Sequence, residues 1–383
     1  MNQKIWLCLA HMSGNEQKYI NEAFETNWVV PLGPNVNAFE EELKESLQGE
    51  TQANPIEVVA LSSGTAAIHI ALTMLGVGPG DEVICQSFTF AASANPIAYL
   101  GAVPVFVDSE AETWNMDPTL LEEAINDRYL VTGHYPKAII PVYLYGMPPK
   151  MDEILAIAKK YNIPVVEDST EAQGTFYKGK AAGTLGHFGS MSFNGNKMIT
   201  TSGGGALICK NVEEKQQAIY YATQARQPKP YYEHTVIGYN YRLSNVSAGI
   251  GRGQMTILKD HVAHHRMVHK LYMEGLNPIE GLRVQNAPNA DFDSSYWLST
   301  LLIDQEKFGC EPLDLMEALS LEGIESRPLW NPMHNQPVFK NAPSYTNGVS
   351  DGLFKIGLCL PSGPMVSEED VLRIIEVIRN FKK

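Results

Sequence analysis

The chain has 383 residues, with 29 Lys and Arg against 43 Asp and Glu, so its formal net charge is −14. Apolar residues make up 44% of it and charged residues 19%, a balance that supports a sizeable core and argues against global disorder. The acidic excess argues against nucleic acid as the main partner, because binding a phosphate backbone needs a concentrated basic surface. This length predicts two domains or one large α/β unit.

The cysteines and the apolar runs indicate the compartment. The five cysteines are widely spread and form no C-x-x-C pair, which fits neither a disulfide framework nor a thiolate metal cage. The apolar run from Ile5 to Ala10 is too short for a signal peptide core. No later run approaches the ~18 apolar residues of a membrane helix. We therefore expect a cytoplasmic protein without membrane insertion.

Short β-rich runs alternate with helical patterns over the first two-thirds of the chain. This alternation predicts a mostly parallel sheet covered by helices. The expected strands lie at residues 57–61, 82–86, 103–107, 138–142, 164–167, 190–193 and 206–209. The expected helices between them lie at residues 65–75, 91–100, 118–126 and 151–161.

The pattern changes near residue 250. A long polar helix is expected around 256–274, followed by a Pro- and Asn-rich stretch and a strand at 296–303. The last helix begins after Ser367, and Asp370 three residues on completes a capping box. We therefore predict a large α/β domain over residues 1–250 and a smaller C-terminal α+β domain over residues 251–383.

A Ser/Gly/Thr stretch follows the first expected strand and opens the first expected helix of the sheet region. Gly64 lets a ligand approach the backbone, the free N–H groups of a helix start attract an anion, and Thr65 adds a hydroxyl. The stretch has neither the lysine of a P-loop nor the G-x-G-x-x-G of a dinucleotide fold. An ordinary Ser/Thr helix cap is the alternative interpretation.

Two acids end the apolar strand near residue 166. Asp168 lies where open α/β sheets place ligands, just beyond the carboxyl end of a strand. A carboxylate there can hold a positively charged heterocyclic nitrogen, a metal or a ribose. A helix cap explains this residue, taken alone, about as well.

A lysine follows the strand near residue 190 and precedes a glycine run at 203–205. Such a lysine, Lys197, is sterically open and can form a Schiff base with an aldehyde cofactor. A lone lysine is more often a solvated surface residue. Four features change this balance together, because residues that follow parallel strands share one edge of the sheet: the Gly64–Thr65 stretch, Phe88, Asp168 and Lys197.

That shared edge matches the needs of pyridoxal phosphate. The Gly64–Thr65 stretch would bind its phosphate, and Phe88 would stack on its ring. Asp168 would keep the ring nitrogen protonated, and Lys197 would hold the aldehyde carbon. The protonated ring would then act as the electron sink for a carbanion.

With these motifs the chain resembles, over nearly its whole length, the DegT/DnrJ/EryC/StrS family of pyridoxal-phosphate-dependent sugar-nucleotide aminotransferases. It is most similar to the subgroup that makes UDP-N-acetylbacillosamine precursors and to exopolysaccharide aminotransferases of that kind. The stretches that carry the resemblance are 63–67, 86–90, 167–168, 192–197, 238–245, 223–226 and 327–330 with His334 following.

The resemblance implies the aspartate-aminotransferase-like (type I) fold, with a mostly parallel seven-stranded sheet in its large domain. It implies that Lys197 carries the cofactor and acts in catalysis, and that Asn240 reaches the site of a neighbouring subunit in a homodimer. Glu171 departs from the Gln or His of many family members near the phenolic oxygen, and an acid there would repel a phenolate unless protonated or turned away. The implied cofactor residues are Gly64, Thr65, Phe88, Asp168, Glu171, Ser192, Lys197 and Asn240, and the implied substrate residues are Trp28, Val29, Arg226, Arg327, Trp330 and His334.

The implied reaction has two halves. L-glutamate would leave its amino group on the cofactor as pyridoxamine phosphate, which would then aminate a nucleotide-linked 4-keto-6-deoxy sugar, with UDP-2-acetamido-4-keto-2,6-dideoxyhexose as the expected substrate. Amination of a GDP- or dTDP-linked sugar, or at C3, stays open. A non-catalytic cofactor-binding regulator is the alternative from another class, although no basic recognition helix is visible.

Three histidines spaced by four residues form a competing pattern. His261, His265 and His269 would share one face of a helix, and zinc would need that geometry with a further ligand. The neighbouring Lys259, Arg266 and Lys270 favour a solvated polar face instead, so we expect no metal site.

Overall fold

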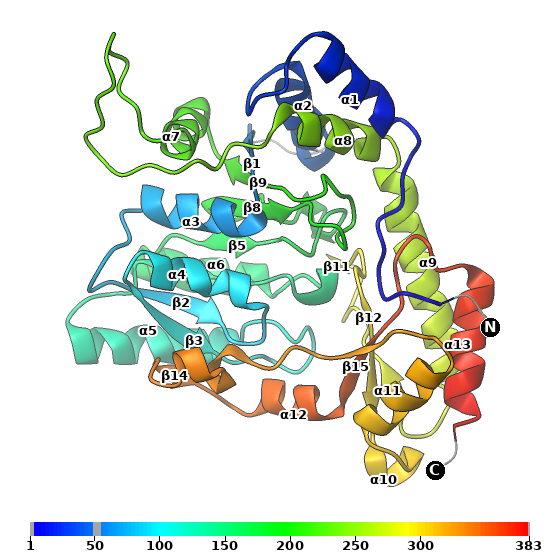
Figure 1. The fold of residues 1–383 in the computed structure, drawn as a ribbon. Coiled ribbons are helices and arrows are strands. Elements are labelled where there is room, and N and C mark those ends of the chain that lie inside the picture. The colour runs from blue at the N-terminus through cyan, green and yellow to red at the C-terminus, as the bar shows by residue number, and fades with distance from the viewer. Residues whose placement is uncertain (1–3, 49–54, 382–383) are drawn as a thin grey trace.

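The computed structural model describes residues 4–48 and 55–381. The ends of the two predicted domains, residues 1–3 and 382–383, therefore lie outside the described residues. A large sheet with helices on both faces fills most of the molecule, and a smaller sheet packs beside it with two long helices (Figure 1). Among the described residues, we find no helix that combines the length and the apolar character needed to cross a bilayer.

The large sheet contains the seven strands predicted from the sequence. Two isolated parallel bridges, Ile139 to Val165 and Val142 to Asp168, join its two four-stranded halves. The strand β9 runs antiparallel to its neighbours, and the other pairings are parallel. The order is β1 (Glu57–Leu61), β9 (Gly205–Cys209), β8 (Phe188–Ser192), β5 (Val166–Asp168), β4 (Ala138–Ile140), β2 (Glu82–Gln86), β3 (Val103–Val107) and the short β14 (Ser344–Tyr345).

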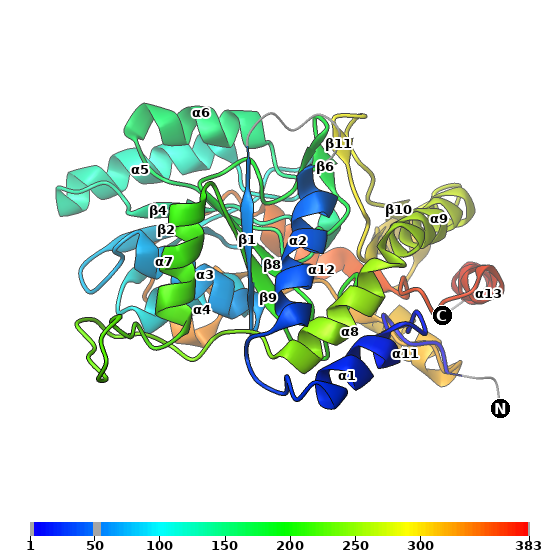
Figure 2. The same ribbon diagram turned by 90° about the horizontal axis from the view of Figure 1, so that it is seen from above.

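Helices cover both faces of this sheet because successive strand residues point to opposite sides. In β2, Val83 and Cys85 pack in one core cluster with α3, whereas Ile84 packs with α5 and α6 on the other face (Figure 2). The helices are α1 (Glu16–Glu25), α2 (Pro34–Gln48), α3 (Gly64–Met74), α4 (Asn95–Tyr99), α5 (Pro118–Thr132), α6 (Met151–Tyr161), α7 (Val212–Ala222) and α8 (Asn245–Met255). The shorter elements are η1 (Ala91–Ser93), η2 (Leu144–Gly146), η3 (Met333–Asn335), η4 (Pro337–Phe339) and the three-stranded β11-β6-β7 (Phe292–Asp293, Phe176–Tyr177, Lys180–Ala181).

The C-terminal part forms a second, antiparallel sheet. Its strand order is β10 (Leu282–Val284), β12 (Ser299–Ile303), β15 (Gly357–Leu360) and β13 (Arg327–Pro328). The remaining helices are α9 (Leu258–Leu276), α10 (Gln305–Phe308), α11 (Pro312–Leu321), α12 (Val349–Ile356) and α13 (Glu368–Arg379). The predicted capping box is confirmed, since Ser367 and Asp370 bond each other's backbone N–H at the start of α13.

Each of the two predicted domains contributes one segment that pairs with the other domain. Near the N-terminus, Ile5 forms a parallel bridge with Ile324 beside the second sheet. Conversely, β14 comes from the C-terminal part, and it pairs in parallel with β3 and extends the large sheet. We retain the division near residue 250 as a proposal, with these two segments crossing it.

The three spaced histidines lie on the buried side of α9, so the expected solvated face is wrong for them. His261, His265 and His269 are 4%, 0% and 3% exposed. The cause is packing: His261 Nδ1 lies 2.9 Å from the carbonyl oxygen of Met198, and His269 stacks on Tyr296 with ring centroids 3.6 Å apart. Within residues 4–48 and 55–381, no group of three His, Cys, Asp or Glu side chains is arranged to hold a metal ion.

Candidate active site

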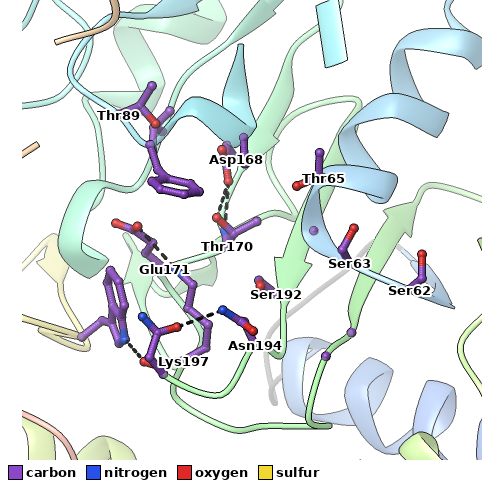
Figure 3. Close-up of a pocket in the computed structure, with 18 of the residues that line it drawn as sticks. Ser62, Ser63, Thr65, Thr89, Asp168, Thr170, Glu171, Ser192, Asn194 and Lys197 are labelled. Carbon is purple, nitrogen blue, oxygen red and sulfur yellow. Dashed lines mark hydrogen bonds and ion pairs between the residues drawn. The ribbon is translucent and has the colours of Figure 1, made fainter. Parts of the chain in front are cut away.

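A cavity of about 400 Å³ opens where the carboxyl ends of β1, β5 and β8 meet (Figure 3). This is the edge at which open α/β sheets bind ligands. The amino end of β9 lies at the same edge, because β9 runs the other way. The cavity is lined by Ser62, Ser63, Gly64, Thr65, Thr89, Phe90, Ala92, Val142, Asp168, Thr170, Glu171, Ser192, Asn194, Asn196, Lys197, Gly203, Gly204, Trp297 and Trp330.

The start of α3 forms one end of the cavity. Ser63 is the N-cap, and its Oγ accepts the Ala66 N–H at 3.0 Å, so the helix-cap interpretation is correct for this residue. The next two residues, Gly64 and Thr65, face the cavity as the first residues of the helix, where backbone N–H groups lack intrahelical partners. A Cβ at Gly64 would lie 2.6 Å from the Thr170 side chain, so only glycine fits this close approach.

Asp168 ends β5 inside the cavity and is 3% exposed. Its Oδ2 accepts the Ser93 hydroxyl at 2.5 Å, and its Oδ1 accepts the Thr170 hydroxyl at 2.7 Å. No helix begins at Asp168, since residues 169–175 form turns, so the helix-cap alternative is wrong here. These donors leave a buried carboxylate held in one orientation at the cavity wall.

Lys197 and Glu171 form an ion pair in the cavity. The Lys197 Nζ lies 3.3 Å from Glu171 Oε1 and 3.8 Å from the centre of the Trp297 ring. The other carboxylate oxygen of Glu171 accepts the Tyr145 N–H at 2.8 Å. Burial raises the pKa of Glu171, and the nearby Lys197 and the Tyr145 N–H partly offset this rise. Lys197 is therefore a half-buried, paired amine, unlike a solvated surface lysine.

The aromatic residue beside the cavity differs from the prediction. Phe88 does not line the cavity; its ring is fully buried and packs edge-on against Tyr145. Phe90 does line the cavity. Phe90 is 60% exposed, and the centroids of the Phe90 and Trp330 rings are 6.3 Å apart. The sequence alone could not decide which of the two rings lines the cavity, because Phe88 and Phe90 both follow β2 in the same Phe-Thr-Phe stretch. We therefore propose Phe90, in place of Phe88, as the residue that stacks on the cofactor ring.

Seven of the residues proposed from the sequence line the cavity: Gly64, Thr65, Asp168, Glu171, Ser192, Lys197 and Trp330. Several proposed residues do not line the cavity of this single chain. Asn240, Arg226 and Arg327 are exposed, Arg327 pairs with Glu325 at 2.7 Å, and Trp28 and Val29 lie on the loop between α1 and α2. His334 instead bonds the Ser87 hydroxyl through Nδ1 at 2.7 Å.

Other cavity residues were missed by sequence reasoning. Thr170 could have been inferred, because it follows Asp168 by two residues and side chains so spaced often bond. Asn194 and Asn196 lie inside the lysine motif and carry no separate signal. Trp297 lies 100 residues beyond Lys197, and its Nε1 donates to the Asn196 carbonyl oxygen at 2.7 Å. Only the tertiary structure brings that ring to the lysine.

A strand-edge cavity with a lysine, a carboxylate and a helix start defines this fold as that of a pyridoxal-phosphate-dependent aminotransferase. The chain belongs to the DegT/DnrJ/EryC1/StrS aminotransferase family, whose model matches residues 10–379. It is 49% identical to EpsN of Bacillus subtilis (strain 168), whose name describes a pyridoxal phosphate-dependent aminotransferase, with 99% of this chain and 96% of EpsN covered. It is 34% identical to GDP-perosamine synthase of Escherichia coli O157:H7, with 97% and 96% covered.

Solved structures agree with this assignment. A DegT/DnrJ/EryC1/StrS aminotransferase of Brucella abortus superposes with a TM-score of 0.88 at 31% identity, covering 96% of this chain and 95% of that one. A sugar aminotransferase of Streptococcus pneumoniae, Spr1654, superposes in its PLP and PMP forms with a TM-score of 0.87. The protein is thus a pyridoxal-phosphate-dependent enzyme of the sugar aminotransferase family, with small molecules as substrates.

The cavity residues fit pyridoxal phosphate by the chemistry of their groups. The helix start at Gly64 and Thr65, with Ser192, offers N–H and hydroxyl donors to a phosphate. In the same cavity, the buried Asp168 offers a fixed negative charge to a ring nitrogen. Lys197, which lines the same cavity, offers an amine to an aldehyde carbon. A phosphate, a ring nitrogen and an aldehyde are the three functional groups that this cofactor presents.

Proposed function

We propose that this aminotransferase moves the amino group of L-glutamate to the C4 keto group of a nucleotide-linked 4-keto-6-deoxy sugar. The proposed sugar is UDP-2-acetamido-4-keto-2,6-dideoxyhexose, and the proposed process is the synthesis of a surface glycan or polysaccharide. The observation that best supports the chemistry is the Lys197 amine held 3.3 Å from Glu171 inside the cavity.

The side chains of the cavity have distinct proposed roles. Pyridoxal phosphate, when bound, supplies an electron sink for negative charge on the substrate carbon. The Asp168 carboxylate keeps a proton on the ring nitrogen, and its Ser93 and Thr170 donors hold it in position. The Lys197 amine accepts a proton from the substrate carbon and returns it in the opposite half-reaction.

The aromatic residues and Glu171 act on that lysine and on the substrate. Trp297 covers the Lys197 amine from one side and so limits the access of water. Glu171 orients the amine by their ion pair. The cavity wall also contains three aromatic side chains, Phe90, Trp297 and Trp330, which would contact the cofactor or the substrate when they are bound.

A panel of keto sugars tests the substrate. Purified enzyme is mixed with L-glutamate and, separately, the UDP-, dTDP- and GDP-linked 4-keto-6-deoxy sugars, and product masses are recorded. We expect efficient amination of the UDP-linked 2-acetamido sugar. A clear preference for a GDP or dTDP sugar would overturn this choice and leave the aminotransferase chemistry intact.

The alternatives are amination of another nucleotide sugar and amination at C3. The similarity to GDP-perosamine synthase supports the first of these. Regiochemistry depends on the orientation of the keto sugar in the cavity, so the structure of the purified product decides it. A cofactor-binding regulator would bind the sugar and glutamate without turnover in the same panel.

We also propose a homodimer in which Asn240 reaches the partner's cavity. Support comes from exposure: Asn240 lies on an exposed loop with Tyr232 and Ile237, which are 79% and 82% exposed. Mixing a Lys197→Ala chain with an Asn240→Ala chain tests this, because a shared site predicts partial recovery of activity in heterodimers. No recovery despite proven subunit exchange would contradict it.

The location is the last part of the proposal. All five cysteines are buried free thiols, which is common in a reducing compartment and supports a cytoplasmic enzyme. Fractionation of the native host, with the protein followed by antibody, tests this.

A further inference from the structure

Tyr145 occupies an unusual backbone conformation beside the active site. It lies in η2, in the connection between β4 and α6, with φ +54° and ψ +18°. This left-handed region is uncommon and strained for a bulky residue. Gly146 follows with φ +93°, and a Cβ there would lie 3.0 Å from the backbone nitrogen of Trp297. Tyr145 and Gly146 are thus two successive left-handed residues. Their turn lies close to the backbone of Trp297, whose ring covers the Lys197 amine.

The backbone of Tyr145 contacts the catalytic pair. Its N–H donates to Glu171 Oε2 at 2.8 Å, while Glu171 Oε1 lies 3.3 Å from Lys197 Nζ. A carboxylate held by one oxygen presents the other in a defined direction. In this turn the Tyr145 N–H points to Glu171, so the turn helps to orient the partner of the lysine.

The side chain of Tyr145 contacts the opposite wall of the cavity. Its hydroxyl accepts the backbone N–H of Trp330 at 2.9 Å and also hydrogen-bonds the Cys359 thiol in β15. Its ring packs on the Trp330 ring, with centroids 5.4 Å apart. Tyr145 itself is 2% exposed and lies in a core cluster with Trp297 and Cys359. One residue therefore joins the lysine side of the cavity to a wall contributed by a segment 185 residues away.

We propose that Tyr145 is a positioning residue that orients Glu171 through its backbone N–H and holds Trp330 in the cavity wall through its hydroxyl. Its hydroxyl sets the affinity for the substrate, because it holds Trp330, which lines the cavity. Its backbone N–H sets the rate of proton transfer, because Glu171 orients the Lys197 amine. The inference rests on the aminotransferase chemistry of the family and does not depend on which keto sugar is used.

The hydroxyl is tested with Tyr145→Phe holoenzyme in the donor half-reaction. Loss of the absorbance band of the lysine-linked cofactor is followed by stopped flow, with the best amino acid that the wild-type enzyme accepts. Loss of one hydrogen bond predicts an apparent Kd raised roughly three- to tenfold, with a limiting rate within about twofold of wild type. Hydrogen exchange of the peptide that contains Trp330 should be faster in the variant, which gives a readout independent of activity.

Two variants serve as matched controls. Tyr272→Phe removes another fully buried hydroxyl, which donates to the Pro361 carbonyl oxygen at 2.9 Å away from the cavity. Cys359→Ala removes the second partner of the Tyr145 hydroxyl and leaves the Trp330 bond. Both should lower the melting temperature without raising the apparent Kd.

Glu171→Gln tests the contact with Lys197 that the Tyr145 N–H orients, because this variant keeps the N–H bond and changes only the group that faces the lysine. The Tyr145 N–H should bind the amide oxygen of the glutamine and leave its NH₂ facing the Lys197 amine, since the N–H cannot donate to another donor. We expect a lower limiting rate and an unchanged apparent Kd, the reverse of the Tyr145→Phe pattern. An unchanged Kd in Tyr145→Phe, the same rise in Tyr272→Phe, or a Glu171→Gln enzyme with the wild-type rate would overturn the proposal.

Discussion

The cofactor side of the cavity and its aromatic side differ in how far apart in the chain their residues lie. On the cofactor side, Gly64, Asp168 and Lys197 each follow a strand of one sheet, so the sheet alone brings them together. On the aromatic side, Trp297 and Trp330 come from the C-terminal part and meet the lysine through long-range packing. Strand order therefore determines the cofactor side of the cavity, whereas the packing of the C-terminal part against the large sheet determines the aromatic side.

This difference predicts two kinds of mutational effect. Changes on the cofactor side should alter chemistry or cofactor binding and leave the fold intact, because the sheet holds those positions. Changes in the aromatic core around the cavity should alter stability or substrate affinity, because packing holds them.

Lys197→Ala should have the largest effect on activity. The change removes both the amine that holds the cofactor and the group that moves the proton. General acid–base transfer alone contributes about 10²–10⁴-fold, so we expect turnover to fall by at least that amount. The fold should persist, as judged by a cooperative unfolding transition and an unchanged circular dichroism spectrum. Turnover near the wild-type value would refute the assignment of the cofactor side.

Phe88 and Phe90 offer the sharpest contrast between a core residue and a cavity residue. Phe88→Ala removes a fully buried ring, which should cost about 3–5 kcal/mol of unfolding free energy. Phe90→Ala should leave the unfolding free energy nearly unchanged, because its ring is 60% exposed, and should weaken cofactor binding instead. Urea unfolding and titration with pyridoxal phosphate measure the two effects. If Phe88→Ala weakened cofactor binding and Phe90→Ala lowered the unfolding free energy, the stacking role would return to Phe88.

Asp168→Asn should slow the reaction without preventing cofactor attachment. An opposite charge in contact with a titratable group shifts its pKa by about 1–3 units, so the loss of the Asp168 charge would lower the protonated fraction of a bound ring nitrogen. We expect the donor half-reaction to slow by roughly ten- to a hundredfold, by the same argument. Ser93→Ala, which removes one donor to that carboxylate, should have a smaller effect in the same direction. A fully active Asp168→Asn enzyme would leave Asp168 with a purely structural role.

The buried histidines of α9 should make the fold sensitive to acid. Burial lowers the pKa of His265 to about 3 and that of His269 to about 4. The unfolded chain binds these protons near pH 6.5 and the folded chain does not, so stability is present above pH 6.5 and is lost as pH falls toward those values. Each histidine should contribute ~1.4 kcal/mol per pH unit within that window.

His265→Leu tests this effect, because His265 is fully buried and leucine cannot take up a proton. Urea unfolding at pH 7.5 and pH 5 should show a smaller loss of stability in this variant than in wild type. The exposed His134→Gln serves as the control and should behave as wild type. An equal loss in all three proteins would assign the acid sensitivity to other groups.

The sequence predicted the sheet and the residues at its edge well, because both depend on short-range signals. The strands at 57–61, 82–86 and 103–107 are confirmed residue for residue, since β-branched runs between glycines and turns mark them clearly. Helix 91–100 is divided into η1 and α4, a break that periodicity alone did not reveal. The positions of Asp168 and Lys197 in the cavity follow from parallel strands ending at one edge.

Only the tertiary structure decided the residues that depend on packing between distant segments. The side of α9 that carries His261, His265 and His269 is buried although its sequence neighbours are charged, because the helix packs against the loop after Lys197 and against Tyr296. The choice between Phe88 and Phe90 depends on which ring the core cluster around Tyr145 encloses. A local sequence pattern determines which residues share one edge of a sheet or one face of a helix. The packing of the two parts of the chain determines which residues that face contacts.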